Sequence, residues 1–287
     1  MKCLLNRRLV DEAKATISPF DRGYLFADGI YEVIAIVDGL LLDSERHWIR
    51  LERSCGEINL PLPMGIEELK SLIADLVSTN AVKEGRVYFQ ITRGVAERDF
   101  AFPAEATPQL FAFVREASVI APPQADIGID AVTVEDLRWK RRDIKSIALL
   151  PQTMAKQEAK ARGAGEAIMM ENGFITEGSS STIHLIKDGK LITRQLSNEV
   201  LPGVTRMSIF DVARDLGMVI EERAFTVQEA QHADELFLTS ASAIVQGIVR
   251  LDDVQIANGS VGLVTHKLRK TYLERSVDEA KRIAMDG

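Results

Sequence analysis

Three short segments carry the side chains best suited to chemistry. Lys145 follows a basic run and precedes apolar residues, Glu177 lies within Thr-Glu-Gly, and residues 201–205 (Leu-Pro-Gly-Val-Thr) are typical of a helix entry. A lysine amine forms imines once its pKa is lowered, and a carboxylate favours a protonated ring nitrogen. A helix N-terminus binds phosphate through its unpaired N–H groups and its dipole. The set predicts a site for a phosphorylated heteroaromatic cofactor.

Pyridoxal 5′-phosphate (PLP) is a cofactor that needs all three groups. Lys145 is predicted to bond to it, and Glu177 to hold its pyridine nitrogen. The Pro-Gly turn, with Thr205 as N-cap, is predicted to cradle its phosphate. Because an isolated lysine is usually a solvated surface residue and an isolated Thr-Glu-Gly is an ordinary turn, the prediction depends on the combination.

Together with residues 21–24 (Asp-Arg-Gly-Tyr) and 28–33 (Asp-Gly-Ile-Tyr-Glu-Val), these segments resemble the fold-type IV PLP enzymes. Within that family the chain is most similar to the D-amino acid aminotransferases, over nearly its whole length. The resemblance implies a two-domain α+β homodimer with PLP at the domain interface. It also implies transamination between D-amino acids and 2-oxo acids, first D-alanine and 2-oxoglutarate, by a ping-pong cycle through the pyridoxamine form.

The resemblance further implies individual contacts. The cofactor contacts that it implies beyond Lys145 and Glu177 are Arg50, Ser180, Ser181, Leu201, Val204, Thr205, Ser240 and Ala241. The substrate contacts that it implies are Tyr31, Arg98, Ser240 and Ala241. His47, near Arg50, is expected to be a structural or interface residue.

One loop departs from the family pattern. Relatives that act on D-amino acids usually hold the substrate carboxylate with Pro-Arg-x-His, whereas this chain has Glu97-Arg98-Asp99-Phe100. Arg98 is retained, but Phe100 has no donor for a carboxylate. We therefore expect a looser or shifted specificity. An L-branched-chain aminotransferase, an aminodeoxychorismate lyase and an (R)-amine transaminase remain open, with a non-catalytic PLP-binding protein as a remote alternative.

Composition limits the other classes of function. The 287 residues carry a net charge of −7, which disfavours a nucleic-acid partner. Cys3 and Cys55 cannot build a disulfide framework, and no apolar run is long enough to span a membrane, so a cytoplasmic location is expected. The four histidines are scattered without metal-ligand spacing, and no metal site is predicted.

The elements that must position these residues suggest two domains. In residues 1–120 a β-branched strand at 31–37 ends at the Asp38-Gly39 hairpin signal, and an amphipathic helix from Ser44 carries Arg50. Further elements are expected there, a helix at 65–77 and strands at 86–92 and 109–114.

The second predicted domain, residues 121–287, begins at Ala-Pro-Pro and carries the PLP lysine. It is predicted to contain two Xaa-Gly hairpins, at Asn172-Gly173 and Asp188-Gly189. The basic run 138–142 is either a solvated strand end or a set of charges that tunes the cofactor. The remaining elements expected are strands at 128–133, 166–170, 182–186 and 235–238 and helices at 150–162 and 205–216.

Overall fold

The computed structural model describes residues 1–286 and confirms the α+β class. The chain divides into two compact units. The first contains Met1–Val119, Ile144–Ala148 and the C-terminal end from Glu279, and the second contains Ile120–Asp143 and Leu149–Asp278. This division differs from a single boundary near residue 120, because the backbone around Lys145 pairs with a strand of the first unit.

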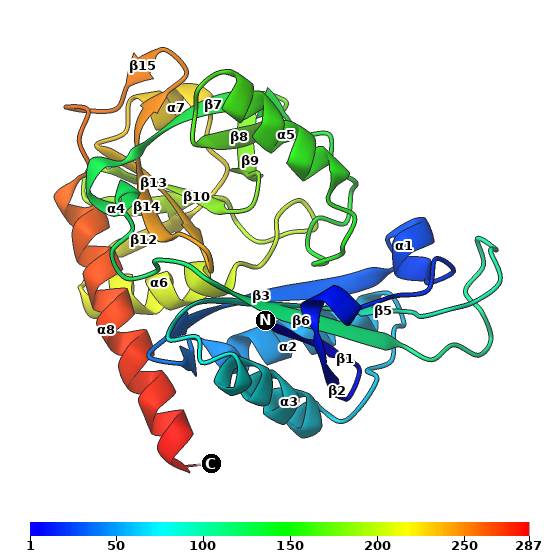
Figure 1. The fold of residues 1–287 in the computed structure, drawn as a ribbon. Helices are drawn as coiled ribbons and strands as arrows, with labels where there is room; N and C mark the ends of the chain where they lie inside the picture. The colour runs from blue at the N-terminus through cyan, green and yellow to red at the C-terminus, as the bar shows by residue number, and fades with distance from the viewer. Residues whose placement is uncertain (287) are drawn as a thin grey trace. The chain divides into compact units, whose positions relative to one another are not determined.

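The first unit is built on one antiparallel sheet of six strands in the order β2-β1-β6-β5-β3-β4 (Figure 1). The strands are β1 (Lys2–Leu5), β2 (Arg8–Asp11), β3 (Gly29–Val37), β4 (Leu40–Leu41), β5 (Glu84–Thr92) and β6 (Gln109–Glu116). The long β3–β5–β6 ladder pairs Ile34 with Val87 and Phe89 with Ala112. These pairs confirm the strands predicted around residues 31–37, 86–92 and 109–114.

Two helices pack on the same face of this sheet (Figure 1). They are α2 (Ser44–Glu57), amphipathic as predicted, and α3 (Ile66–Thr79), which confirms the helix predicted at 65–77. Trp48 and Leu51 of α2 and Ile73 of α3 are buried against sheet residues such as Phe89. The opposite faces of both helices are mostly polar, with Ile49 of α2 as an exposed exception, so the apolar stripes decide which side of each helix meets the sheet. Two short helices complete this part of the chain, η1 (Glu12–Lys14) and α1 (Arg22–Phe26).

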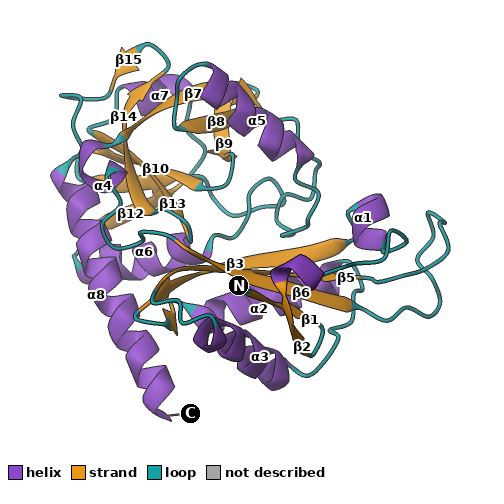
Figure 2. Cartoon of the chain, viewed as in Figure 1, coloured by secondary structure: helices purple, strands orange, loops and turns teal. Residues whose placement is uncertain are grey.

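The second unit is built on a mixed, curled sheet of nine strands (Figure 2). The strand order is β12-β11-β10-β13-β14-β7-β8-β9, with β15 beside β14. The strands are β7 (Ile129–Glu135), β8 (Glu166–Glu171), β9 (Phe174–Gly178), β10 (Thr182–Lys187), β11 (Lys190–Thr193), β12 (Val219–Glu222), β13 (Glu235–Ser240), β14 (Ile244–Leu251) and β15 (Val254–Gln255).

Helices pack beside this sheet through small or aliphatic side chains. The helices are α4 (Gln124–Ile127), α5 (Leu150–Ala161), α6 (Val204–Asp215), α7 (Val227–Gln231) and α8 (Leu263–Asp286). Ala155 and Ala159 of α5 are buried against Val132 and Met169 of the sheet. Thr226 caps α7 through a reciprocal capping box with Glu229.

Both predicted hairpins of the second unit are confirmed. Asn172 and Gly173 connect β8 to β9, with φ of 53° and 80°, and Asp188 and Gly189 connect β10 to β11, with φ of 49° and 73°. Positive φ at both central residues is what a two-residue hairpin of this type requires, and it explains the Asn-Gly and Asp-Gly sequences.

One local prediction was wrong. Helix α6 has Gly203 as its N-cap, so Thr205 is the second helical residue rather than the cap. Thr176, Glu177 and Gly178 belong to β9, whose partner is β8, and do not form the turn that is typical of an isolated Thr-Glu-Gly.

No helix within residues 1–286 is long and apolar enough to cross a membrane. Across the same residues, His, Cys, Asp and Glu side chains do not gather in threes as metal ligands would. Cys3 and Cys55 are both buried and free.

Candidate active site

Lys145 is positioned by backbone pairing with β3. The amide of Tyr31 donates to the Lys145 carbonyl at 3.0 Å, and the amide of Ile147 donates to the Gly29 carbonyl at 3.0 Å. Strand β4 pairs only with the C-terminal end of β3. The edge of the first half of β3 is therefore available to pair with the segment around Lys145. A Cβ at Gly29 would lie 2.7 Å from the Ile91 carbonyl, so glycine is required at this crossing.

The side chains of Lys145 and Tyr31, both predicted site residues, lie together. The Nζ of Lys145 is 4.1 Å from the centroid of the Tyr31 ring, and that ring stacks on Tyr88 at 5.6 Å. Tyr88 donates from its hydroxyl to Gln90 at 2.7 Å, and burial raises its pKa. Sequence reasoning missed Tyr88, although the alternation along β5 puts it on the same face as Gln90.

Arg50 has a buried carboxylate partner in the first unit. Its Nε donates to Oε1 of Glu32 at 2.8 Å, and its Nη2 donates to Oε2 at 2.7 Å. His47 lies 2.7 Å from the same Oε2. Burial opposes the charge of Glu32, but Arg50 and His47 overcome it and lower the pKa of Glu32 to about 2. Glu32 therefore holds the Arg50 guanidinium in place, and the phosphate contact expected of Arg50 has to be made from that position.

Burial also lowers the pKa of His47. The ring is therefore neutral near pH 7, and it donates its Nδ1–H to Glu32 because an ionised carboxylate is only an acceptor. The buried contact with Glu32 gives His47 a structural role, which is one of the two alternatives expected for it. Glu32 itself was not predicted, since a glutamate within an apolar strand sequence gives no sign of its partner.

Arg98 lies in an exposed loop of the first unit, among aromatic rings. Its guanidinium carbon is 5.3 Å from the centroid of Phe26 and 5.6 Å from that of Phe100. The two rings are 5.6 Å apart, and Phe100 is 79% exposed. Arg22 donates to the Asp99 carbonyl at 2.6 Å and fixes the loop backbone. Phe100 thus contributes a ring face to Arg98 instead of a second donor.

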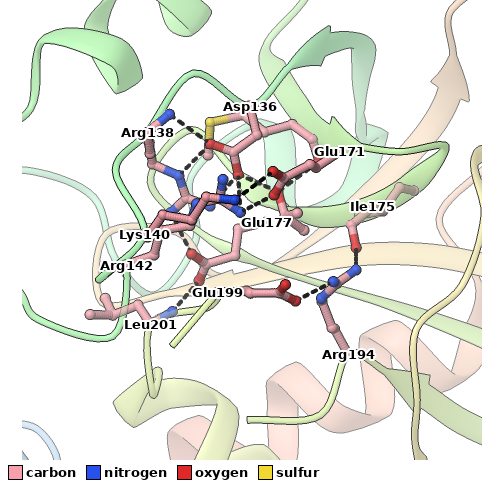
Figure 3. A network of polar contacts seen from close by, with 12 residues as sticks. Asp136, Arg138, Lys140, Arg142, Glu171, Ile175, Glu177, Arg194, Glu199 and Leu201 are labelled. Atoms are coloured by element: carbon pink, nitrogen blue, oxygen red, sulfur yellow. Dashed lines mark hydrogen bonds and ion pairs between the residues drawn. The ribbon is translucent and has the colours of Figure 1, made fainter. Parts of the chain in front are cut away.

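Glu177 lies in β9 of the second unit and is held on both carboxylate oxygens (Figure 3). The Nη1 of Arg138 donates to its Oε2 at 2.5 Å, and the amide of Leu201 donates to its Oε1 at 3.0 Å. Burial raises the pKa of Glu177, and Arg138 opposes this by favouring the charged form. The contact with Leu201 links the carboxylate to the loop that enters α6.

The N-terminus of α6 has the features of an anion site. Gly203 caps the helix without a side-chain acceptor, and the first N–H groups of a helix have no partner within it. A Cβ at Gly203 would lie 2.8 Å from Oγ1 of Thr182, so the backbone turns closely past β10. Val204 and Thr205 are both buried in the first turn.

The serine segment after β9 is organised by a buried glutamate. Oγ of Ser179 donates to Oε1 of Glu166 at 2.5 Å, and Oγ of Ser181 donates to Oε2 at 3.3 Å. Ser180 lies between them and is exposed. Glu166 was missed by sequence reasoning; the only signal was a charged residue at the start of an otherwise apolar strand.

Ser240 and Ala241 lie at the turn from β13 to β14. Oγ of Ser240 accepts from the amide of Ala243 at 3.0 Å, and Ile244 has a φ of 62°. Of the predicted site residues, the first unit therefore holds Tyr31, Arg50, Arg98 and Lys145. The second unit holds the others, which are Glu177, Ser180, Ser181, Leu201, Val204, Thr205, Ser240 and Ala241.

The chain is similar to known proteins over almost its whole length. The family model described as amino-transferase class IV matches residues 29–251. D-alanine aminotransferase of Staphylococcus haemolyticus is 40% identical over 94% of this chain and 96% of its own, and that of Bacillus licheniformis is 38% identical over 96% and 97%. The branched-chain amino acid aminotransferase of Thermobaculum terrenum, solved in its PLP form, shares the fold. Its TM-score is 0.84, with 25% identity over 98% of this chain and 95% of its own.

Proposed function

This chain belongs to the class IV aminotransferase family, and from that premise we propose that it is a PLP-dependent enzyme exchanging the amino group of a D-amino acid with a 2-oxo acid. The first substrate pair is D-alanine with 2-oxoglutarate, giving pyruvate and D-glutamate. The observation that carries the proposal is 40% identity to a D-alanine aminotransferase across 94% of the chain.

The donors present fit PLP at three chemically different points. The buried Glu177 carboxylate suits the pyridine nitrogen, the N-terminus of α6, which has no side-chain cap, suits the phosphate, and Lys145 supplies the amine. Bound PLP supplies an aldehyde that condenses with amines and a ring that withdraws electrons from the substrate Cα. Further proposed contacts to it come from Arg50, Ser180, Ser181, Leu201, Val204, Thr205, Ser240 and Ala241.

Lys145 is the proposed proton carrier. Its backbone is fixed on β3 while its Nζ stays beside the Tyr31 ring, so the amine can move without displacing the strand. In this position Nζ takes the proton from the substrate Cα and returns one during the second half of the cycle. Tyr31 limits where the substrate can lie next to that amine.

Arg98 is the proposed binding group for the substrate carboxylate, and its replacement is the first prediction. Arg98→Ala removes the cation, so we expect the KM for D-alanine to rise about tenfold or more with a smaller change in kcat. Steady-state kinetics with saturating 2-oxoglutarate measures both constants. Arg8→Ala, an exposed arginine of β2, is the matched control. An unchanged KM in Arg98→Ala would show that another group holds the carboxylate.

A single-turnover absorbance assay tests the proposed function. The protein is loaded with PLP and mixed separately with D-alanine, L-leucine, aminodeoxychorismate and (R)-1-phenylethylamine. We expect D-alanine to convert the bound cofactor to its pyridoxamine form and to release one equivalent of pyruvate. Conversion by L-leucine or the amine alone would mean that the same core serves a different donor, and no cofactor absorbance at all would contradict the PLP assignment.

Two further properties are proposed with the function. We propose that two copies associate as a homodimer, which light scattering of the purified protein tests by its mass. We also propose a reducing, cytoplasmic location, because the two cysteines are free and buried. Fractionation of cells that express the chain tests this location.

A further inference from the structure

A buried ion network lies behind Glu177 in the second unit (Figure 3). Asp136 follows β7 and accepts from Arg138 at three atoms: the backbone amide and Nε both donate to Oδ1 at 3.0 Å, and Nη2 donates to Oδ2 at 2.7 Å. The remaining Nη1 donates to Glu177. One guanidinium is therefore shared between two carboxylates, and its direction is fixed by Asp136.

Asp136 is itself held from two other directions. Oγ1 of Thr176 donates to its Oδ2 at 2.6 Å, and Nη1 of Arg142 lies 3.4 Å from the same atom. Thr176 is the residue before Glu177 in β9, so the strand that carries Glu177 is tied to the group that orients Arg138. Asp136, Arg138 and Glu177 are joined by these hydrogen bonds into one unit, which we call the ion triad.

The charges of the ion triad do not cancel. Its side chains are at most 6% exposed, and two carboxylates with one guanidinium leave one negative charge. Nη1 of Arg142 is shared between Oε2 of Glu171 at 2.8 Å and Oδ2 of Asp136 at 3.4 Å, so Arg142 offsets part of the charge of Asp136. Buried charges are stable only when paired, and Arg138 divides its charge between two carboxylates, so the Glu177 end of the ion triad is suited to an added cation.

We propose that Arg138, fixed by Asp136, is a positioning residue that keeps Glu177 ionised and directed, so that the ion triad stabilises the protonated pyridine nitrogen of PLP. This inference rests on the proposed function and extends it to two residues outside the predicted site. For the basic run 138–142, it favours charges that tune the cofactor over a solvated strand end. Arg138 is buried and tunes the site, whereas Lys140 has a side chain that is 91% exposed.

The titration of Glu177 supports this role. Burial raises its pKa, Arg138 lowers it, and the charge of Asp136 raises it. The guanidinium of Arg206 in α6 also interacts electrostatically with the Glu177 carboxylate. Burial favours the neutral acid, and Arg138 is the largest opposing influence. Without Arg138, a proton between Glu177 and the pyridine nitrogen of bound PLP would be expected to lie on the carboxylate, because burial favours the neutral acid.

The direct test is ¹⁵N NMR of the pyridine nitrogen, using the holoenzyme loaded with ¹⁵N-labelled PLP. We expect a protonated nitrogen in the wild type, a neutral nitrogen in Arg138→Gln, and a protonated nitrogen again in Arg138→Lys, which restores the charge. We also expect PLP affinity to fall about tenfold or more in Arg138→Gln. Arg142→Gln is the matched control, because it removes a buried arginine bound to Asp136 that does not contact Glu177.

A protonated nitrogen in Arg138→Gln would overturn the proposal, and so would a neutral nitrogen in both Arg138→Gln and Arg142→Gln. Neither result depends on the substrate. The D-amino acid assignment is tested separately by turnover, so its failure is distinguishable from failure of this inference.

A second measurement uses the apoprotein, so it tests the inference even if Arg138→Gln no longer binds PLP. In the apoprotein, a Glu177 pKa raised above its unfolded value stabilises the fold below about pH 4.3, and this stability is lost as pH rises through the folded pKa. We expect Arg138→Gln to lose stability with rising pH more steeply than Arg138→Gln/Glu177→Gln, measured by urea midpoints. Equal slopes would show that Arg138 does not control the charge of Glu177.

Discussion

Replacement of Lys145 by alanine is expected to lower the turnover of D-alanine by about ten-thousandfold, because one side chain supplies both the amine and the proton carrier. The geometry makes substitution by a neighbour ineffective. Arg141 pairs with Asp143 and Arg142 with Glu171, so neither offers a free basic amine. Lys145→Arg should be equally inactive, since a guanidinium stays protonated and cannot accept the substrate proton.

Two measurements separate the roles of Lys145. Single-turnover kinetics reports loss of proton transfer, and borohydride reduction followed by peptide mass analysis reports whether PLP is attached at Lys145. Lys140→Ala is the control, because Lys140 is close in sequence but its side chain is 91% exposed. We expect the control to keep its activity and its PLP-labelled peptide. Substantial turnover by Lys145→Ala, or labelling of another lysine, would contradict the assignment.

The parts of the fold that were predictable are those set by local rules. The strand at β3 and its Asp38-Gly39 turn were recognisable from β-branched residues followed by a glycine dipeptide. The same holds for the hairpin at Asn172-Gly173. Helix α2 was recognisable from Trp48 and Leu51 on one face, because helical period and burial coincide there.

The buried ion pairs that hold the predicted site residues could not be found from local sequence rules. Glu32 lies 18 positions from Arg50, and Arg138 lies 39 positions from Glu177. The partner of a buried charge depends on which strands are adjacent, and sequence spacing gives no measure of that. The same limit applies to Thr-Glu-Gly, which on its own is typical of a turn. Its residues are polar or small, but β8 supplies a partner that makes them a strand.

The strand location also changes what Glu177 can do. A turn glutamate would be solvated and mobile, whereas a strand glutamate between Arg138 and the Leu201 amide has a fixed direction and a buried environment. Fixed, desolvated groups interact more strongly with a bound charge than solvated ones. The buried strand position of Glu177 therefore supports its proposed contact with a ring nitrogen.

Glu32→Gln is expected to lower the free energy of unfolding of the apoprotein by about 3–5 kcal/mol, because it leaves the Arg50 guanidinium buried without a countercharge. Glutamine can keep one hydrogen bond to Arg50 or His47 but cannot supply the charge. Urea denaturation near pH 7 measures the loss. Glu52→Gln, an exposed glutamate on the same helix as Arg50, is the control and should change stability by less than about 0.5 kcal/mol.

The pH dependence of the unfolding free energy tests the prediction for Glu32→Gln independently. Both Glu32 and His47 have pKa values lowered by folding, so each contributes stability that is present above its unfolded pKa and lost as pH falls. The loss begins below about pH 6.5 for His47 and below about pH 4.5 for Glu32, and the Glu32 share ends near pH 2. A fall in the pKa of Glu32 from 4.5 to about 2 corresponds to about 3 kcal/mol. Glu32→Gln should therefore reduce the loss of unfolding free energy at low pH by about this amount. An unchanged loss would mean that the buried pair with Arg50 does not stabilise the fold.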